Sequence, residues 1–404
     1  MRKLLAGTVL AVTVFIVWRL VSGRPGTAAD EVKRMPAGEA REAAAEVRTA
    51  EAEEARLSRL AAAYAPGVVV LTNAVLAFDP RKRVKVPSEE WSRYQAEKHG
   101  VSKLGGPKAK VTFHVVDEDG NSVTNATVSV NLAVNNVRPV TGRTDCDGLF
   151  TAEGRLSEEL IYGVTKDGFY KTRSTFSFGG LGIVSMEEGR RIPWNPTFRV
   201  TLKQVRNPIP MYARQVRIEL PKKSEKYGYD LVKGDLVEPY GKGRQADMVL
   251  SCFGDKPPPL SRNYKETLVI ESNCTRGGFV RRRKDGWSTL FSVHEAPREG
   301  YLDKLTLHTD SEESRQPQKI EIGDDCYIII RSRVTIDVKD GLESACFGKI
   351  YGPVTFGITT NDREGAGVAF KYYFNPAPND RNIEYAPRNN LFKGLKSYED
   401  VYEP

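Results

Sequence analysis

The chain has 404 residues, of which 40% are hydrophobic and 28% are charged. These ordinary values exclude a polytopic membrane protein and a wholly disordered chain, and the length favours two or three compact domains. The formal net charge is +8, but residues 1–29 hold four basic residues and no acid. The remaining excess is too dilute for a phosphate-tracking surface, so we expect no nucleic acid partner.

Residues 1–29 have the pattern of an export signal. Arg2 and Lys3 precede an uncharged run, which Arg19 interrupts before it resumes. If Arg19 snorkels, residues 4–21 are long enough to cross a membrane. Two outcomes stay open: a cleaved signal that releases the protein, and an uncleaved single-pass anchor in the cytoplasmic membrane, which we favour slightly. In both, the positive-inside rule places the bulk of the chain outside the cytoplasm, in the periplasm or beyond.

Residues 30–66 are expected to form a helical stalk. The composition from 37 to 65 is dominated by Ala, Glu and Arg, and Pro36 and Pro66 flank it at the positions where a helix starts and stops. Apolar residues at alternating three-four spacing permit a coiled coil, so self-association through 37–65 is an alternative to a solvated spacer helix. We favour the spacer because these side chains are small. Residues 67–108 form a connector of mixed composition.

Residues 109–220 predict a first β-sandwich. Alternating runs at 110–116 and 126–132 are separated by turn-forming residues at 117–121, and the same pattern recurs around the acidic glycine turn at 145–148. Short strands at even spacing, without a long helix between them, favour an antiparallel sandwich.

Three runs in this segment carry a family resemblance: VTFHVVDEDGNSVTNATVSV, GRTDCDGLF and GVTKDGFYK. Together they resemble the carboxypeptidase regulatory-like domain, a transthyretin-type seven-stranded sandwich, over about residues 109–204. Asp117–Gly120 matches its D-x-x-G turn and Thr144–Phe150 matches T-D-x-x-G-x-F, whereas Cys146 inside the second turn and Phe169 in place of Tyr depart from the pattern. The resemblance implies an accessory module of exported proteins without activity of its own. The whole chain also resembles uncharacterised exported proteins of Verrucomicrobia and Lentisphaerae bacteria.

Residues 221–374 predict a second β-sandwich or jelly roll. β-rich runs in this segment are separated by Gly, Pro, Asn and Asp, which end strands and form turns. Residues 375–404, rich in Asn and Pro, are expected to be an ordered wrap or a loose end without regular structure. The predicted fold class is therefore mainly β, with two sandwiches following an N-terminal membrane or signal helix and a helical stalk.

No motif of a known catalytic class is found in the sequence, and we assign no catalytic residue. The carboxypeptidases that carry such a module hold zinc through His and Glu, whereas the four histidines here are scattered and form no His-x-x-Glu pair. A nucleophile elbow, a phosphate loop and a dinucleotide fingerprint are also absent from the sequence. His294 and Glu295 are neighbours on an expected strand, where their side chains point to opposite faces, so we interpret them as structural.

The chain has five cysteines, and their spacing does not suit a metal site. An odd number in an exported protein leaves at least one thiol free or paired between chains. Cys252 with Cys274 and Cys326 with Cys346 are candidate hairpin disulfides, but we favour buried, reduced thiols; Cys146 is the fifth.

One metal hypothesis follows from the turns of the first sandwich. In a meander of hairpins, the turn with Asp117 and Asp119 lies at the same end as the turn with Asp145 and Asp147. Four carboxylates there would offer the oxygen ligands that Ca²⁺ takes. The alternative, which we favour, is that each aspartate caps its own turn, since neither turn has the EF-hand order of ligands. We expect no other cofactor.

Four aromatic residues of the second sandwich are candidates for stacking on a ligand: Tyr240, Trp287, Tyr372 and Tyr373. The alternative is that they are core residues or cross-strand pairs.

We expect a non-catalytic cell-envelope protein that presents its β-modules to other envelope proteins or wall polymers. The alternative is a carbohydrate-binding protein or glycan-acting hydrolase with its site in the second sandwich.

Overall fold

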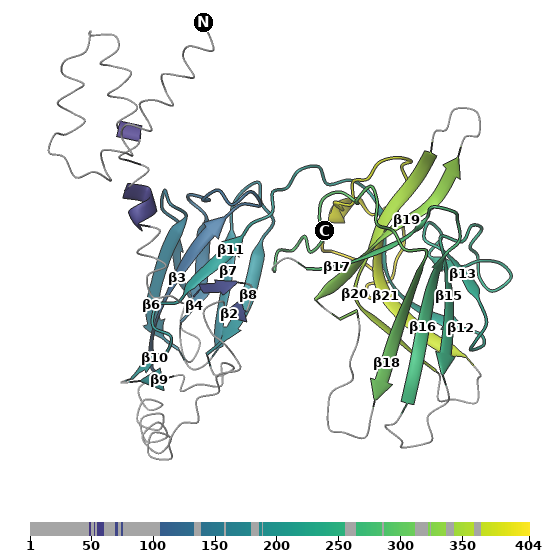
Figure 1. Cartoon of the computed structure of the whole chain (residues 1–404), viewed down its shortest axis with the longest axis horizontal. Helices are drawn as coiled ribbons and strands as arrows, with labels where there is room; N and C mark the ends of the chain where they lie inside the picture. The colour runs from purple at the N-terminus through teal and green to yellow at the C-terminus, as the bar shows by residue number, and fades with distance from the viewer. Residues whose placement is uncertain are drawn as a thin grey trace, which may run out of the picture. The chain divides into compact units, whose positions relative to one another are not determined.

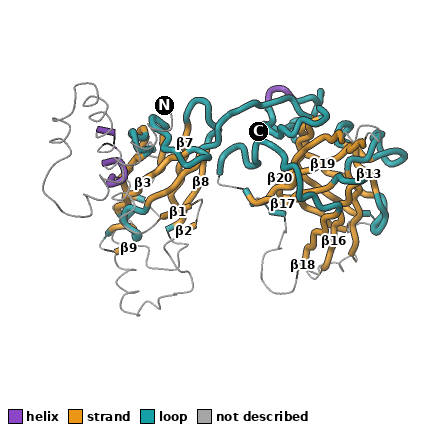
Figure 2. The backbone as a smooth tube through the Cα atoms, turned by 45° about the horizontal axis from the view of Figure 1, so that its top comes forward, coloured by secondary structure: helices purple, strands orange, loops and turns teal. Residues whose placement is uncertain are grey.

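The structure is a computed structural model that describes most of the chain beyond residue 105. The described residues are 48, 49, 52, 55–59, 69–71, 74, 75, 106–132, 139–156, 159–178, 186, 187, 189–254, 264–284, 287–311, 322, 323, 325–336, 343–358 and 365–404. Strands dominate them, with loops between the strands (Figure 2). The fold is therefore mainly β.

The chain divides into two compact units, Met1–Val68 and Val69–Pro404. In the first unit the described residues are 48, 49, 52 and 55–59, and all are helical. The remainder of the helix expected over 37–65 and the whole export signal lie outside the described residues. None of the helices that are described is long and apolar enough to cross a membrane.

Two sheets form the first sandwich (Figure 1). The larger has the order β2-β1-β11-β3-β10-β9, with β6 also paired to β3, and the smaller has the order β5-β4-β7-β8. The strands are β1 (Val69–Leu71), β2 (Ala74–Val75), β3 (Lys108–Val116), β4 (Thr127–Asn131), β5 (Val140–Arg143), β6 (Leu149–Arg155), β7 (Glu159–Thr165), β8 (Thr172–Ser177), β9 (Met186–Glu187), β10 (Arg190–Arg191) and β11 (Thr197–Thr201).

The core of this sandwich follows from the period-two pattern of its strands. β8 alternates buried and exposed side chains along its whole length. Aromatic rings from both sheets meet in the middle: Phe113 of β3 lies 5.3 Å from Phe198 of β11 and 5.0 Å from Tyr162 of β7, between ring centroids. Burying each such ring stabilises the fold by about 1.5–3 kcal/mol.

The expected all-antiparallel pairing is wrong for the larger sheet. β11 runs parallel to β3, with Phe198 opposite Phe113, and β1 runs parallel to β11. Parallel neighbours need a long crossover, and the chain between β3 and β11 supplies one through the smaller sheet. The expected connector over 67–108 contributes two short strands, β1 and β2, to this sheet.

Two five-stranded sheets form the second sandwich, with the orders β12-β21-β20-β19-β17 and β14-β13-β15-β16-β18. The strands are β12 (Tyr212–Leu220), β13 (Tyr227–Asp230), β14 (Asp235–Leu236), β15 (Met248–Gly254), β16 (Tyr264–Ser272), β17 (Gly278–Arg283), β18 (Lys304–Ser311), β19 (Cys326–Ile336), β20 (Glu343–Ile358) and β21 (Ala366–Asn375). Their facing sides share one large core; for example, Tyr229 of β13 packs against Phe370 of β21.

The boundary between the sandwiches lies earlier than the expected residue 221. β12 pairs with β21 along its entire length, from Tyr212 opposite Phe374 to Leu220 opposite Ala366. The second sandwich therefore begins at about Tyr212, and the segment around Pro221 is a turn within it.

The tail after β21 packs onto the outer face of the β12-β21-β20-β19-β17 sheet. Ile383, Tyr385 and Val401 form a second core there with Tyr373 of β21 and Ile329 of β19. A single 3-10 turn, η2 (Pro387–Asn389), interrupts the otherwise irregular tail. The tail thus covers part of the outer face, which explains why stretches of the inner strands β19 and β21 are buried on both sides.

Candidate functional site

The two acidic turns proposed to hold Ca²⁺ do lie at the same end of the larger sheet, because β3 and β6 pair antiparallel. The carboxylates of Asp117 and Asp145 accept hydrogen bonds within their own turns. Asp117 accepts hydrogen bonds from the amides of Asp119 and Asn121, and Asp145 accepts one from the amide of Asp147. Within the described part of the chain, no group of three His, Cys, Asp or Glu side chains could hold a metal ion. The structure therefore gives the calcium hypothesis no ligand set.

The four aromatic residues proposed for stacking do not form a platform. Tyr372 and Tyr373 are adjacent on β21, point into opposite cores and are 0% exposed, so they cannot stack on a ligand. Trp287 is 44% exposed, and its carbonyl accepts the amide of Arg173 from the first sandwich. Tyr240 is 52% exposed and lies elsewhere, on the loop between β14 and β15.

None of the five cysteines forms a disulfide, and all five lie among the described residues. The register of β19 and β20 places Cys346 opposite Ser332, six residues along β19 from Cys326, which explains why Cys326 and Cys346 are not bridged. Cys252 lies opposite Leu268 in the ladder of β15 and β16. Burial raises the pKa of the Cys252 thiol to about 12, so it is protonated at neutral pH.

His294 and Glu295 both have structural partners. The His294 Nε2 atom lies 2.7 Å from the Gln204 carbonyl oxygen, and its Nδ1 atom lies 3.4 Å from the Glu118 carboxylate of the first sandwich. Glu295 pairs with Arg381 of the tail at 2.6 Å. His294 therefore belongs to a contact between the two sandwiches, whereas Glu295 ties the tail to the second sandwich.

Glu384 of the tail is the buried acid of that contact. It is 1% exposed, and its carboxylate accepts hydrogen bonds from the Tyr170 hydroxyl at 2.7 Å and from the amides of Arg206 and Asn207 at 3.0 and 2.8 Å. Tyr170 belongs to the first sandwich and the two amides to the segment that joins the sandwiches. Burial and the Glu384 carboxylate together raise the pKa of Tyr170.

A Ser–Lys pair lies beside this contact. Lys349 Nζ donates to Ser292 Oγ at 3.0 Å, and the Tyr351 hydroxyl lies 3.1 Å from the same oxygen. Burial, with a smaller contribution from the charge of Lys203, lowers the pKa of Lys349 well below its ordinary value. Ser292 and Lys349 are both 0% exposed, so the pair is closed to a substrate.

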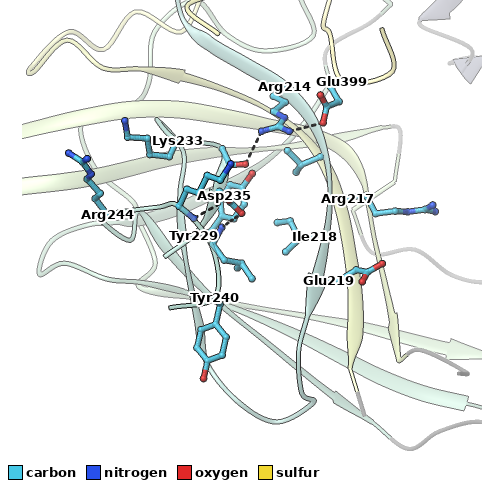
Figure 3. Close-up of a pocket in the computed structure, with 14 residues that line it drawn as sticks. Arg214, Arg217, Ile218, Glu219, Tyr229, Lys233, Asp235, Tyr240, Arg244 and Glu399 are labelled. Carbon is cyan, nitrogen blue, oxygen red and sulfur yellow. Dashed lines mark hydrogen bonds and ion pairs between the residues drawn. The ribbon is translucent and has the colours of Figure 1, made fainter. Parts of the chain in front are cut away.

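An open groove of about 680 Å³ lies where the two sheets of the second sandwich end, between the edge strands β12 and β14. Arg214 and Glu399 lie at one end of it and Tyr240 at the other, with Arg217 and Glu219 on the β12 side and Lys233 and Arg244 on the opposite side (Figure 3). Val216, Ile218 and Leu236 contribute its apolar floor.

Two aspartates accept hydrogen bonds from amides of the loops that form one wall of this groove. Asp230 accepts amide hydrogen bonds from four residues of the loop, and Asp235 accepts those of Leu236 and Lys242. Burial alone would raise the pKa of Asp230, but the amide hydrogen bonds outweigh it and lower that pKa. Arg333 also pairs with Asp230 at 3.0 Å. Both carboxylates therefore stabilise the loop through these hydrogen bonds.

At the other end, Arg214 is held by its neighbours. Its guanidinium donates to the Gly234 carbonyl at 2.9 Å and to the Glu399 carboxylate at 2.6 Å. The hydrogen bond from Arg214 lowers the pKa of Glu399, which keeps that carboxylate ionised at neutral pH. The Arg214 Nε atom, which is buried, has no hydrogen-bond partner among the described residues.

The groove carries an excess of positive charge. Its cations are Arg214, Arg217, Lys233, Lys242 and Arg244, and its acids are Glu219, Asp235 and Glu399. Asp235 is occupied by amides and Glu399 by Arg214, whereas the side chains of Lys233, Lys242 and Arg244 are exposed and have no ion-pair partner within the described ranges. The groove can therefore attract an anion.

The sequence interpretation included Tyr240 but missed the rest of this groove. Its residues come from two edge strands, the loops beside β14 and the tail, and only the tertiary pairing brings them together. A local signal existed in the run VKGDLVEPYGKGR, where three exposed cations alternate with turn-forming glycines. Gly241 and Gly243 are needed there because a Cβ atom would lie 2.4 and 2.8 Å from the Leu236 carbonyl oxygen.

Comparison with known proteins assigns no family. A scan against protein-family models and a search of curated proteins find no match. Among solved structures, the chain is similar to 3-chlorocatechol 1,2-dioxygenase from Rhodococcus opacus 1CP, with 15% identity, a TM-score of 0.21 and coverage of 25% of this chain and 60% of that one. Catechol 1,2-dioxygenase from Pseudomonas arvilla C-1 has 11% identity and a TM-score of 0.20, with coverage of 26% of this chain and 54% of that one. Chlorocatechol 1,2-dioxygenase from Pseudomonas putida has 11% identity and a TM-score of 0.19, with coverage of 39% of this chain and 99% of that one.

The chain thus spans little more than half the length of the first two dioxygenases. The TM-scores are too low for these likenesses to bear on the fold or the activity of this protein.

Proposed function

We propose that the protein is a non-catalytic cell-envelope protein that presents two β-sandwiches outside the cytoplasmic membrane and binds other envelope components there. The observation that carries the binding role is the groove beside β12, where exposed cations without ion-pair partners among the described residues surround an apolar floor. The basic and apolar N-terminus supports export, and the resemblance of residues 109–204 to an accessory module supports a role without catalysis.

Fractionation of the native host tests the location. The proposal predicts that the protein sediments with the membranes, resists extraction with carbonate and is released by detergent, as an uncleaved anchor requires. A cleaved signal would instead place a shortened chain in the periplasm or the medium, and export would still hold. Recovery of the full-length protein from the cytosol would contradict the proposal.

A second candidate function is carbohydrate binding at the same groove. The observation that favours it is Tyr240, which is half exposed at one end of the groove and packs edge-on against Tyr227, with 4.8 Å between the ring centroids. A fixed, exposed ring of this kind suits stacking on a sugar. A glycan array with the wild type and Tyr240→Ala tests this candidate: a hit lost in the variant supports it, and an array without hits contradicts it.

A further inference from the structure

We infer that the groove binds an acidic peptide in extended conformation, by strand addition to the open edge of β12. This inference rests on the proposed binding role and names the chemistry of the partner. Three features carry it: a free strand edge, a segment of the chain's own tail that shows the binding mode, and cations placed along the edge.

Backbone groups along the outer edge of β12 alternate in direction, as in any antiparallel strand. The amide of Gln215 donates outward to the Glu399 carbonyl, and the amide of Ala213 donates outward to Asn390 Oδ1. Because the pairing with β21 continues without a shift, the amide and carbonyl of Arg217 point outward as well. The structure gives them no partner on that side among the described residues, so the edge is open from Arg217 onward.

The tail shows how an acidic segment docks on this edge. Glu399 accepts the Gln215 amide with its main-chain carbonyl and the Arg214 guanidinium with its carboxylate, at 2.9 and 2.6 Å. One residue therefore combines a strand-type hydrogen bond with an ion pair. The next outward-facing position along the strand, Arg217, has the same backbone geometry without an occupant among the described residues.

Charge and shape beyond Glu399 favour an acidic strand over other anions. Lys233, Lys242 and Arg244 line the groove on the side of the loops beside β14, while Val216 and Ile218 line it on the β12 side. In a strand added to the edge of β12, one set of side chains lies beside Val216, Ile218 and the loops beside β14, and the other set lies on the outer face beside Arg217. Acidic side chains therefore meet cations on either side. A sugar polymer can pair with the cations but lacks the regular amide and carbonyl groups that the edge of a strand requires.

The probe is a fluorescent peptide with three Glu-Val repeats, added to the full-length protein in detergent, and the readout is fluorescence anisotropy. We expect saturable 1:1 binding, and binding weaker by about tenfold or more for the matched Gln-Val peptide. The double variant Lys242→Glu, Arg244→Glu should weaken binding by a similar factor. Both side chains are exposed, so the variant is expected to fold. Lys108→Glu, a single charge reversal at an exposed position of the first sandwich, should leave binding unchanged.

Two variants at one position separate strand addition from simple charge attraction. Arg217→Ala removes the charge and keeps the outward amide, whereas Arg217→Pro removes both, and an edge strand tolerates proline where its amide faces outward. We expect Arg217→Pro to bind the peptide several-fold more weakly than Arg217→Ala. The same peptide with all its amides methylated gives the complementary test without any change in the protein, and it should bind about tenfold more weakly.

Failure to bind the Glu-Val peptide would overturn the inference, and so would equal binding of the methylated peptide. Tighter binding of oligogalacturonate, weakened by the same double charge reversal, would assign the groove to an anionic sugar polymer instead. None of these results changes the fractionation of the protein, so they are distinguishable from a failure of the proposed envelope location.

Discussion

Replacing Glu384 with alanine is expected to destabilise the protein strongly, because the buried carboxylate is the shared acceptor of three donors. The hydroxyl of Tyr170 and the amides of Arg206 and Asn207 would all lose their partner. A buried donor left unsatisfied costs about 1–3 kcal/mol, so we expect the free energy of unfolding to fall by about 3–5 kcal/mol, with some relief from entering water. Urea denaturation of the full chain, followed by circular dichroism, measures this change.

The matched control is Tyr170→Phe, which removes one donor and leaves the carboxylate with two amides. Losing one hydrogen bond to a charged acceptor should cost about 1.5–3 kcal/mol, less than Glu384→Ala. The double variant Glu384→Ala, Tyr170→Phe also removes the Tyr170 hydroxyl that Glu384→Ala leaves without an acceptor. It should therefore be no less stable than Glu384→Ala alone. A loss below about 1 kcal/mol for Glu384→Ala, or strictly additive losses, would refute this account of the contact.

Two further predictions concern the second sandwich. Gly234 has φ +66°, and a Cβ atom there would lie 2.8 Å from Arg214 Nη1. Gly234→Ala should therefore lower the thermal midpoint, with a loss of about 1–2 kcal/mol in the free energy of unfolding. The control is Gly367→Ala, where the space is open, and equal midpoints for the two variants would contradict the prediction. Burial raises the pKa of Glu266 even though its carboxylate accepts a hydrogen bond from the Ile358 amide at 2.7 Å. The stability that this raised pKa contributes is fully present below the ordinary pKa of glutamate, and it is lost as the pH rises through the folded-state pKa. Glu266→Gln should therefore gain stability relative to the wild type as the pH rises above the ordinary pKa of glutamate in denaturant titrations, and a pH-independent difference would count against this reasoning.

Local patterns were sufficient to predict strands and turns. The alternation in β8 and the acidic glycine turn after β3 both follow from side chains within a few residues of each other. The start of the second sandwich could not be found this way, because β12 is assigned to it by pairing with β21, the last strand of the chain's described residues. Long-range pairing of this kind leaves no signal in the local sequence.

The aromatic pair Tyr372 and Tyr373 shows a second limit. Alternation along a strand predicts that one of two neighbours faces the core and the other faces solvent. Here the tail covers the outer face of the sheet through Ile383 and Tyr385, so Tyr373 is buried as completely as Tyr372. The irregular sequence of the tail gives no indication of the face on which it packs.

The side of the membrane on which the first sandwich lies is the central claim, and Cys146 reports it directly. It is the one exposed thiol among the five cysteines, of which Cys274 is partly exposed and the other three are buried. A membrane-impermeant maleimide added to intact spheroplasts of the native host should label the wild type, and Cys146→Ser should lose most of the label. Labelling that occurs only after lysis would place the sandwich in the cytoplasm and contradict the account.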